Sequence, residues 1–301
     1  MLELKSITKS FRDFKVLEDI NITARPGEIY GLVGSNGCGK TTLLKHILQI
    51  YRQDSGELYY KGEVVKEDSE LFKDFYYVQD DLFFPFSSTL RTLFEYEKMF
   101  YENMSEEKFN KLIKFFSIDS DKKLSTMSKG QKKQAAFVLA MAANPKVLLL
   151  DEIVDGLDAV VRRKFWNVLI KEVQENNMIV IISSHALKEL DNISDRVGIM
   201  HQGKIIKEEN MESLRDNLKR IQFAVEGEYE DIQGENFRVL KTVKIGSVYF
   251  VTLEGNTEEF EKALREKYKV LIFSELAMNL EEIFITELGG TGYGIEEYDE
   301  E

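Results

Sequence analysis

Residues 34 to 41 are of the types that bind phosphate, in the order Gly34-Ser35-Asn36-Gly37-Cys38-Gly39-Lys40-Thr41. This order fits the pattern G-x-x-x-x-G-K-[ST], in which backbone N–H groups surround the phosphates of a nucleotide. Glycines allow the positive φ values that turn these N–H groups inward. Lys40 can reach the β- and γ-phosphates, and the Thr41 hydroxyl can hold Mg²⁺. We therefore predict that residues 34–42, which include Thr42, bind a nucleoside triphosphate.

The sequence on both sides of this loop predicts the elements that would position it. Residues Glu28 to Val33 predict a buried strand, and residues Thr41 to Tyr51 predict a helix with an apolar face. A bound phosphate would then lie at the helix N-terminus, where free N–H groups and the helix dipole favour an anion. The alternative is a glycine-rich turn without a ligand, and the order strand, loop, helix argues against it.

Cys38 lies within this loop, and two interpretations of it stay open. A small side chain fits a tight turn, so Cys38 can be purely structural. The helix N-terminus and Lys40 would also favour a thiolate, which would make redox chemistry possible there.

A pair of carboxylates forms the second group of residues that could do chemistry. Residues Val147 to Leu150 predict a buried strand, which ends in Asp151 and Glu152. Neighbouring side chains on a strand point to opposite sides, so the two acids can have different roles. Asp151 suits Mg²⁺ binding beside Thr41, and Glu152 suits activation of an attacking water. The simpler alternative, two solvated acids at a strand end, is disfavoured by the preceding phosphate loop.

The order of predicted elements indicates an α/β chain followed by a smaller unit. Residues 1–210 alternate strands and helices, with a mainly helical insertion at about 86–143. We expect a P-loop ATPase core here, with a mainly parallel sheet, an antiparallel β part and a helical subdomain. Residues 211–301 predict a small α+β domain, a candidate for dimerisation or regulation, that ends in a mobile acidic tail. Besides a helix at Thr257–Lys267, we expect strands at Leu2–Ile7, Val16–Ile22, Met178–Ser183, Val197–His201, Lys204–Lys207, Ile221–Val225, Val239–Lys244, Val248–Leu253 and Val270–Phe273.

Composition limits the classes to which the chain can belong. Its single cysteine excludes an internal disulfide framework and suits a reducing cytosol. The net charge of −13 argues against nucleic acid as a partner, because such surfaces need clustered Lys and Arg. We see no apolar run long enough to span a membrane, and the N-terminal residues lack the apolar core of a signal peptide.

Taken together, the motifs resemble those of the nucleotide-binding subunits of ATP-binding-cassette (ABC) transporters, over residues 1 to about 208. They occur in the family's order along the chain. Phe11 stands where the family often places an aromatic ring against adenine, although Phe14 could take this role and Phe11 could instead be a core residue. The other matching motifs are the phosphate loop, Gln79 of the Q-loop, Ser128-Lys129-Gly130-Gln131 of the signature, Asp151-Glu152, Gly156-Leu157-Asp158 of the D-loop and His185 of the switch.

The resemblance implies an ATPase that uses ATP and Mg²⁺. Glu152 would be the general base, and His185 would contact the γ-phosphate and help to position Glu152 and the water. Gln79 would contact Mg²⁺ and sense the membrane subunit. Asp151 would hold Mg²⁺ together with Thr41.

The signature motif implies a head-to-tail dimer in which Ser128, Gly130 and Gln131 close over the ATP of the other subunit. The residues themselves support a second anion site, because Ser128 can cap a helix that continues through Ala143. Gln131 completes the capping-box pattern with Ser128.

Three residues depart from the family's usual pattern. Lys129 replaces a glycine of the signature, Met127 replaces its leading leucine, and Ile153 stands where proline often follows the glutamate. Ser128 and Gly130 remain in place, so we still expect hydrolysis.

The resemblance also implies partners and a location. A homodimer or heterodimer would drive transmembrane permease subunits on separate chains, at the cytoplasmic face of the cell membrane. The run Leu82-Phe83-Phe84-Pro85-Phe86 is a candidate docking surface for the permease, or alternatively part of the helical core. The ending Leu280-Glu281-Glu282-Ile283-Phe284 is similar to that of bacterial subunits that export drugs, bacteriocins or toxic peptides, so we expect export.

Two other classes of protein are alternatives to a transporter subunit. A soluble ABC ATPase acting on ribosomes usually carries two cassettes, and one acting on DNA usually carries a long coiled coil between its two nucleotide motifs; neither occurs here. A non-catalytic regulatory module would not need Glu152 and His185.

Overall fold

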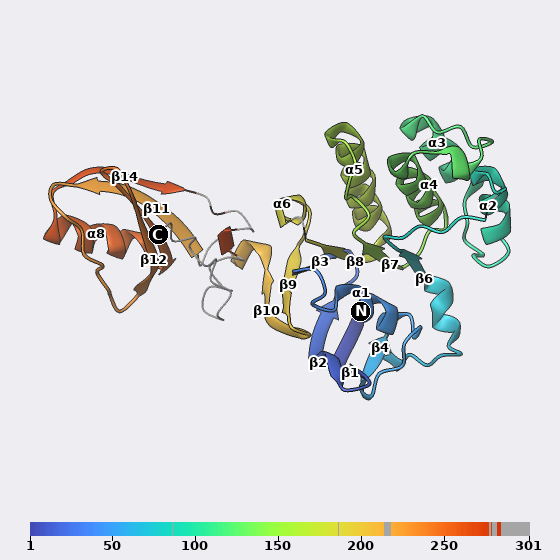
Figure 1. Ribbon diagram of the computed structural model, residues 1–301, viewed down its shortest axis with the longest axis horizontal. Coiled ribbons are helices and arrows are strands. Elements are labelled where there is room, and N and C mark those ends of the chain that lie inside the picture. Colours follow the sequence, from blue (N-terminus) through green and yellow to red (C-terminus); the bar gives the residue numbers. More distant parts are fainter. Residues whose placement is uncertain (86, 186, 214–217, 277, 279–281, 284–301) are drawn as a thin grey trace, which may run out of the picture. The chain divides into compact units, whose positions relative to one another are not determined.

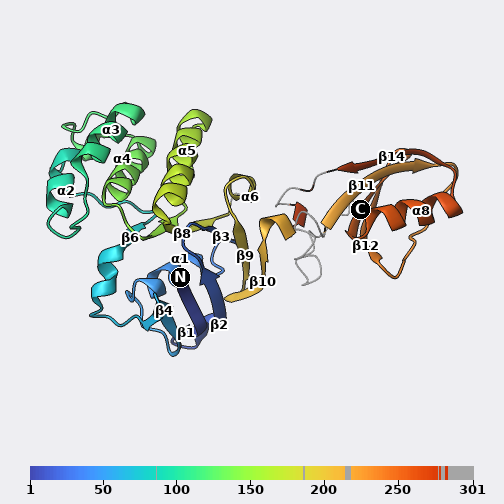
Figure 2. The same cartoon turned by 180° about the vertical axis from the view of Figure 1, so that it is seen from behind.

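The computed structural model describes residues 1–85, 87–185, 187–213, 218–276, 278 and 282–283. The chain forms two compact units, Met1–Glu208 and Glu209–Glu301. Each unit has its own sheets and helices, as Figures 1 and 2 show from opposite sides.

An antiparallel sheet opens the first unit. It consists of β1 (Leu2–Phe11), β2 (Phe14–Ala24), β4 (Ser55–Tyr60) and β5 (Glu63–Val64), in the order β2-β1-β4-β5. The two strands expected near the N-terminus are confirmed, and both extend beyond the expected ranges. The sequence analysis did not predict β4, which lies beside β1.

A six-stranded sheet of order β10-β9-β3-β8-β7-β6 forms the centre of the first unit. The expected apolar strands appear as β3 (Ile29–Gly34), β7 (Val147–Asp151) and β8 (Ile179–Ser184), and every residue of these three is buried. The pairs β3–β8, β3–β9, β7–β8 and β6–β7 are parallel, which confirms the expected mainly parallel sheet. The expected hairpin is present as β9 (Arg196–His201) and β10 (Lys204–Asn210). The edge strand β6 (Phe75–Val78) was not predicted from the sequence.

Helix α1 (Lys40–Ile47) contacts strands of both sheets, namely β2, β3 and β7. Its apolar side chains Leu43, Leu44 and Ile47 join one buried cluster with residues of β1, β4 and β8. The helix ends earlier than predicted, because Gln49 takes a left-handed φ of 54°.

The predicted helical insertion contains α2 (Leu90–Glu97), α3 (Glu106–Phe116) and α4 (Lys129–Ala142), and α5 (Ala159–Asn176) lies beside them (Figure 1). Short helical turns lie at Glu70–Asp74, Leu124–Thr126 and α6 (Leu187–Leu190). From Lys133 onward every residue of α4 is buried, as in a helix that is packed on all sides.

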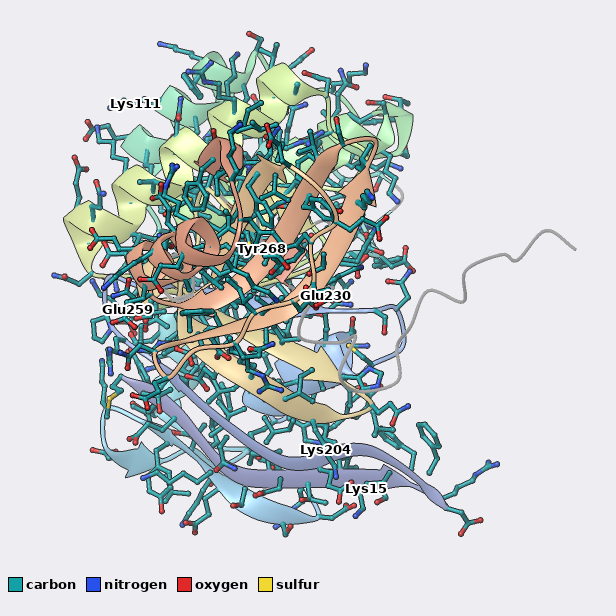
Figure 3. All side chains as sticks on the ribbon, turned by 90° about the vertical axis from the view of Figure 1, so that its left-hand side faces the viewer. Lys15, Lys111, Lys204, Glu230, Glu259 and Tyr268 are labelled. Atoms are coloured by element: carbon teal, nitrogen blue, oxygen red, sulfur yellow. The ribbon has the colours of Figure 1, made fainter. Side chains whose placement is uncertain are left out.

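The second unit is the expected α+β arrangement. Its antiparallel sheet has the order β12-β13-β11-β14, and α8 (Thr257–Lys267) spans the predicted residues. Beside the core, the Tyr268 hydroxyl accepts a hydrogen bond from the Glu230 backbone N–H at 3.0 Å (Figure 3). The strands are β11 (Leu218–Val225), β12 (Phe237–Ile245), β13 (Val248–Gly255) and β14 (Val270–Leu276).

Several features fall outside the described residues. They include Leu280, Glu281 and Phe284 of the exporter-like ending, Phe86 of the candidate docking run, and the acidic tail. Within the described part of the chain, no helix is long and apolar enough to cross a membrane.

An aromatic stack between α4 and α5 gives a test of the packing. Phe137 and Phe165 are fully buried, and their ring centroids lie 3.6 Å apart. Phe165→Ala should lower the free energy of unfolding by about 3–5 kcal/mol, because it removes a buried ring and leaves a cavity. Urea unfolding measures the change. Val160→Ala is the control, since Val160 lies on the same helix and is 69% exposed; an equal loss in both variants would contradict the packing described here.

Candidate functional site

The phosphate loop connects β3 to α1, and its middle residues Asn36 and Gly37 are exposed. Gly34 ends β3, and Gly39 precedes α1 with a φ of 114°. A Cβ on Gly39 would lie 2.7 Å from Met200 Cε and 3.0 Å from the Val16 carbonyl. Glycine is therefore needed here both for the backbone conformation and for space.

Lys40 is the cation of this loop and is only 5% exposed. Its Nζ donates to the carbonyls of Gly34 at 2.8 Å and Ser35 at 3.1 Å. The same Nζ lies 3.6 Å from Glu152 Oε1. The ammonium group therefore joins the phosphate loop to the end of β7.

The loop borders a cavity of about 290 Å³ that is open to solvent. Glu152 reaches it from the end of β7, and Asp80, next to Gln79, reaches it from the end of β6. Of the predicted phosphate-binding residues, Gly34, Ser35 and Cys38 do not line it. The cavity is lined by Val16, Asn36, Gly37, Gly39, Lys40, Thr41, Thr42, Asp80 and Glu152.

Asp151 is buried at the end of β7, with 2% exposure. Its Oδ1 accepts a hydrogen bond from Ser183 Oγ at 2.5 Å, and its Oδ2 accepts one from the Tyr77 hydroxyl at 3.2 Å. Burial, and after it the charge of Asp151, raises the pKa of Tyr77, so this hydroxyl remains a donor. The sequence analysis missed both partners, although each lies near the carboxyl end of a strand beside β7.

Glu152 lies between Lys40 and His185. Its Oε2 is 3.2 Å from His185 Nδ1, which is also 3.5 Å from Asp155 Oδ2. The Glu152 backbone has a φ of 47°, in the left-handed region that is uncommon for residues with a Cβ. Three separately predicted residues, Lys40, Glu152 and His185, are thus brought together at one point.

The sequence matches the family described as ABC transporter over residues 17–155. The ABC transporter ATP-binding protein YtrB of Bacillus subtilis (strain 168) is 32% identical to it, over 96% of this chain and 99% of that protein. The chain belongs to the ABC transporter ATP-binding family.

Two further similarities extend this assignment. The bacitracin transport ATP-binding protein BcrA of Enterococcus faecalis is 27% identical, over 97% of both chains. A dimeric ATP-binding cassette in a post-hydrolysis state with ADP and Pi shares the fold, with a TM-score of 0.62, 24% identity, and coverage of 70% of this chain and 99% of that one. As a member of this family, the chain is an ATPase subunit of an ABC transporter, and the likeness to the dimeric cassette confirms the P-loop ATPase fold.

The signature residues lie apart from the cavity at the phosphate loop: none of Ser128, Gly130 and Gln131 is among the described residues that line it. Ser128 caps α4 as predicted: its Oγ accepts a hydrogen bond from Gln131 N–H at 3.2 Å, and Gln131 Oε1 accepts one from Ser128 N–H at 3.1 Å. Gln79 follows β6 and is exposed.

Phe11 lies at the end of β1 and is 41% exposed, which contradicts the alternative of a core position. Its ring meets the Tyr51 ring edge-on at a centroid distance of 5.2 Å. Phe14 is 70% exposed, so both aromatic candidates remain accessible to a ligand.

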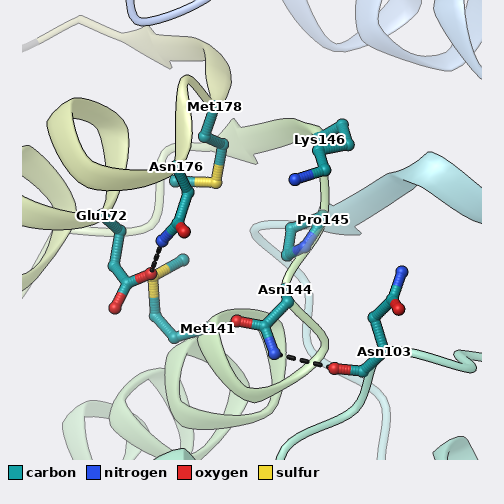
Figure 4. A pocket seen from close by; sticks show the side chains of 8 residues that line it. All are labelled: Asn103, Met141, Asn144, Pro145, Lys146, Glu172, Asn176 and Met178. Carbon is teal, nitrogen blue, oxygen red and sulfur yellow. Dashed lines mark hydrogen bonds between the residues drawn. The ribbon is translucent and has the colours of Figure 1, made fainter.

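Larger cavities lie away from the phosphate loop among the described residues, and two of them adjoin α5. One of about 410 Å³ is bordered by the ends of α4 and α5, where Asn176 donates a hydrogen bond to Glu172 and Asn144 donates to the Asn103 carbonyl (Figure 4). The other, of about 640 Å³, shares Asn144, Glu172 and Asn176 with it and extends along α3. Neither contains any of the predicted nucleotide-binding residues.

Cys38 is buried with 6% exposure, and this burial raises the pKa of its thiol in spite of the opposing charge of Lys40. The expectation that the helix N-terminus and Lys40 favour a thiolate is therefore wrong, because desolvation outweighs both. Burial therefore supports the structural interpretation of Cys38.

Alkylation of Cys38 tests this pKa shift. A raised pKa leaves less thiolate at neutral pH, so the rate should rise with pH around a midpoint above the value of about 8.5 for a free thiol. Iodoacetamide labelling across a pH series, followed by mass spectrometry, measures the rate without ambiguity because the chain has one cysteine. N-acetylcysteine is the reference, and a midpoint below that of the reference would contradict the burial argument.

Proposed function

We propose that Glu152 is the general base for ATP hydrolysis in this transporter subunit. The supporting observation is that its carboxylate lies 3.6 Å from Lys40 and 3.2 Å from His185, beside the phosphate loop. A carboxylate held next to the phosphate site can take a proton from the attacking water. His185 contacts the γ-phosphate and helps to position Glu152 and the water.

The phosphate-binding roles follow from charge and position. Lys40 binds the β- and γ-phosphates, and N–H groups of residues 34–42 surround them at the start of α1. The exposed Phe11 packs against adenine.

Thr41, Asp151 and Gln79 fit a Mg²⁺ site because they offer the oxygen ligands that this ion prefers. Thr41 lines the cavity, and Asp151 is held in place by Ser183 and Tyr77. Mg²⁺, when bound, neutralises charge on the phosphates. Thr41, Asp151 and Gln79 would hold this ion.

We further propose that two copies close head to tail over two ATP molecules. The capped start of α4 offers free N–H groups for an anion, and Ser128, Gly130 and Gln131 lie apart from their own subunit's cavity. A second copy can bring them to the nucleotide. A cassette of the same fold is dimeric, which supports a dimer here.

The transmembrane partners are separate permease subunits, and the ATPase works at the cytoplasmic face of the membrane. Phe83 is 81% exposed, which supports a permease-docking surface rather than a helical-core position for the run at residues 82–86. Further exposed apolar side chains lie at and just after the end of α2: Tyr96, Met99 and Phe100. Export is favoured because the similarity to the bacitracin transport subunit continues through the second unit of this chain. We propose that this second unit acts in dimerisation or regulation.

Glu152→Gln tests the central assignment. The amide keeps the shape of the side chain but cannot accept the proton, so ATP should still bind while steady-state hydrolysis falls by about 100-fold or more. Size-exclusion chromatography in Mg-ATP should show accumulation of a closed dimer. Wild-type turnover in this variant would disqualify Glu152 as the base.

A further inference from the structure

Lys133 is a buried lysine of α4 with 0% exposure. A buried ammonium group is unfavourable unless its charge and its donors are satisfied by the protein. The acceptors of this group therefore show which parts of the fold it holds together.

Each of the three N–H donors of Lys133 has an acceptor. Nζ donates to the Glu152 carbonyl at 2.7 Å, to the Asp155 carbonyl at 3.1 Å and to Asp80 Oδ1 at 3.3 Å. A lysine ammonium has three donors, so none is left for another ligand. One side chain thus connects the helix that starts at Ser128, the turn after β7 and the residue that follows Gln79.

The bond to the Glu152 carbonyl matters because the Glu152 backbone is left-handed, with a φ of 47°. On one side of this residue, the Glu152 N–H donates to the Ser183 carbonyl at 3.1 Å. On the other side, Lys133 holds the carbonyl. With both peptide groups fixed, the carboxylate is directed toward Lys40 and His185, and an uncommon backbone conformation is maintained by its surroundings.

We propose that Lys133 is a positioning residue for ATP hydrolysis: it fixes the Glu152 backbone and links it to the signature helix and to the Asp80 end of the Q-loop. This inference rests on the proposed role of Glu152 as general base. A shift of α4, which begins at the signature motif, is transmitted through Lys133 to the Glu152 carboxylate of the same subunit.

Lys133→Met in the full chain tests the proposal, because methionine keeps most of the volume and removes the ammonium group. The expected result is a fall in kcat by about 10- to 100-fold, since a small misplacement of a reacting group has effects of this size. The dissociation constant for ATP should stay within about twofold, because Lys40 and the phosphate loop are unchanged. Lys108→Met is the matched control, since Lys108 is also largely buried and bonds Asn144 and Glu172 instead.

The kcat and affinity readings separate positioning from general loss of structure. Wild-type kcat in Lys133→Met, or a loss of ATP affinity as large as the loss of kcat, would overturn the proposal. If the methionine variant does not fold, Lys133→Gln replaces it. Its shorter amide has two donors and no charge, so a reduced kcat with unchanged ATP affinity is expected, and wild-type kcat again overturns the proposal.

The double variant Lys133→Met/Glu152→Gln shows whether Lys133 acts through Glu152. Its single-turnover rate should equal that of Glu152→Gln alone, because a misplaced base has no further effect once the base is gone. A further drop as large as that caused by Lys133→Met alone would contradict the inference. Wild-type turnover in Glu152→Gln itself would instead overturn the assignment of the base, so the two failures are distinguishable.

Discussion

The parallel register of β3, β8 and β7 is the constraint on which the site depends. Val33 pairs with Ser184, and Asp151 pairs with Ser183, so the three strands end at one edge of the sheet. The phosphate loop, the acid pair and His185 each follow directly from one of these strand ends. Residues more than a hundred positions apart in the chain therefore meet without any long loop to hold them, as expected where the carboxyl ends of parallel strands form a ligand site.

Two buried lysines then hold Glu152 from opposite ends. Lys40 lies against its carboxylate, whereas Lys133 binds its backbone carbonyl. Both cations are balanced by acids, because Lys40 lies beside the Glu152 carboxylate and Lys133 also binds the Asp80 carboxylate. The site thus combines a backbone in an uncommon conformation with charges that keep it in place.

The sequence predicted the parts of the fold whose signal is local. Continuous apolar runs indicated β3, β7 and β8, and the glycine and lysine spacing indicated the phosphate loop. It did not predict β4 and β6, which are short and rich in tyrosine, and which form strands because neighbouring strands pair with them.

The partners of the acids could not be found from local patterns. Tyr77, Ser183 and Lys133 are polar or charged residues whose roles depend on contacts between distant segments. One signal was present, since only Gln134 separates Lys133 from the apolar stretch Ala135–Ala142 of α4. Of the two interpretations left open for Cys38, the thiolate is disfavoured for a related reason: the sequence shows the neighbouring charge of Lys40 but does not show how much water is excluded from the thiol.

The most direct measurement is a titration of fluorescent ATP into the wild-type chain and into Lys40→Ala. Lys111→Ala serves as the control, because Lys111 is exposed on α3 and outside the nucleotide cavity. If Lys40 binds the phosphates, Lys40→Ala should lose at least about tenfold in affinity, the size expected for a lost charge-assisted hydrogen bond, while Lys111→Ala keeps wild-type affinity. Unchanged affinity in a folded Lys40→Ala chain would contradict the placement of ATP at this loop.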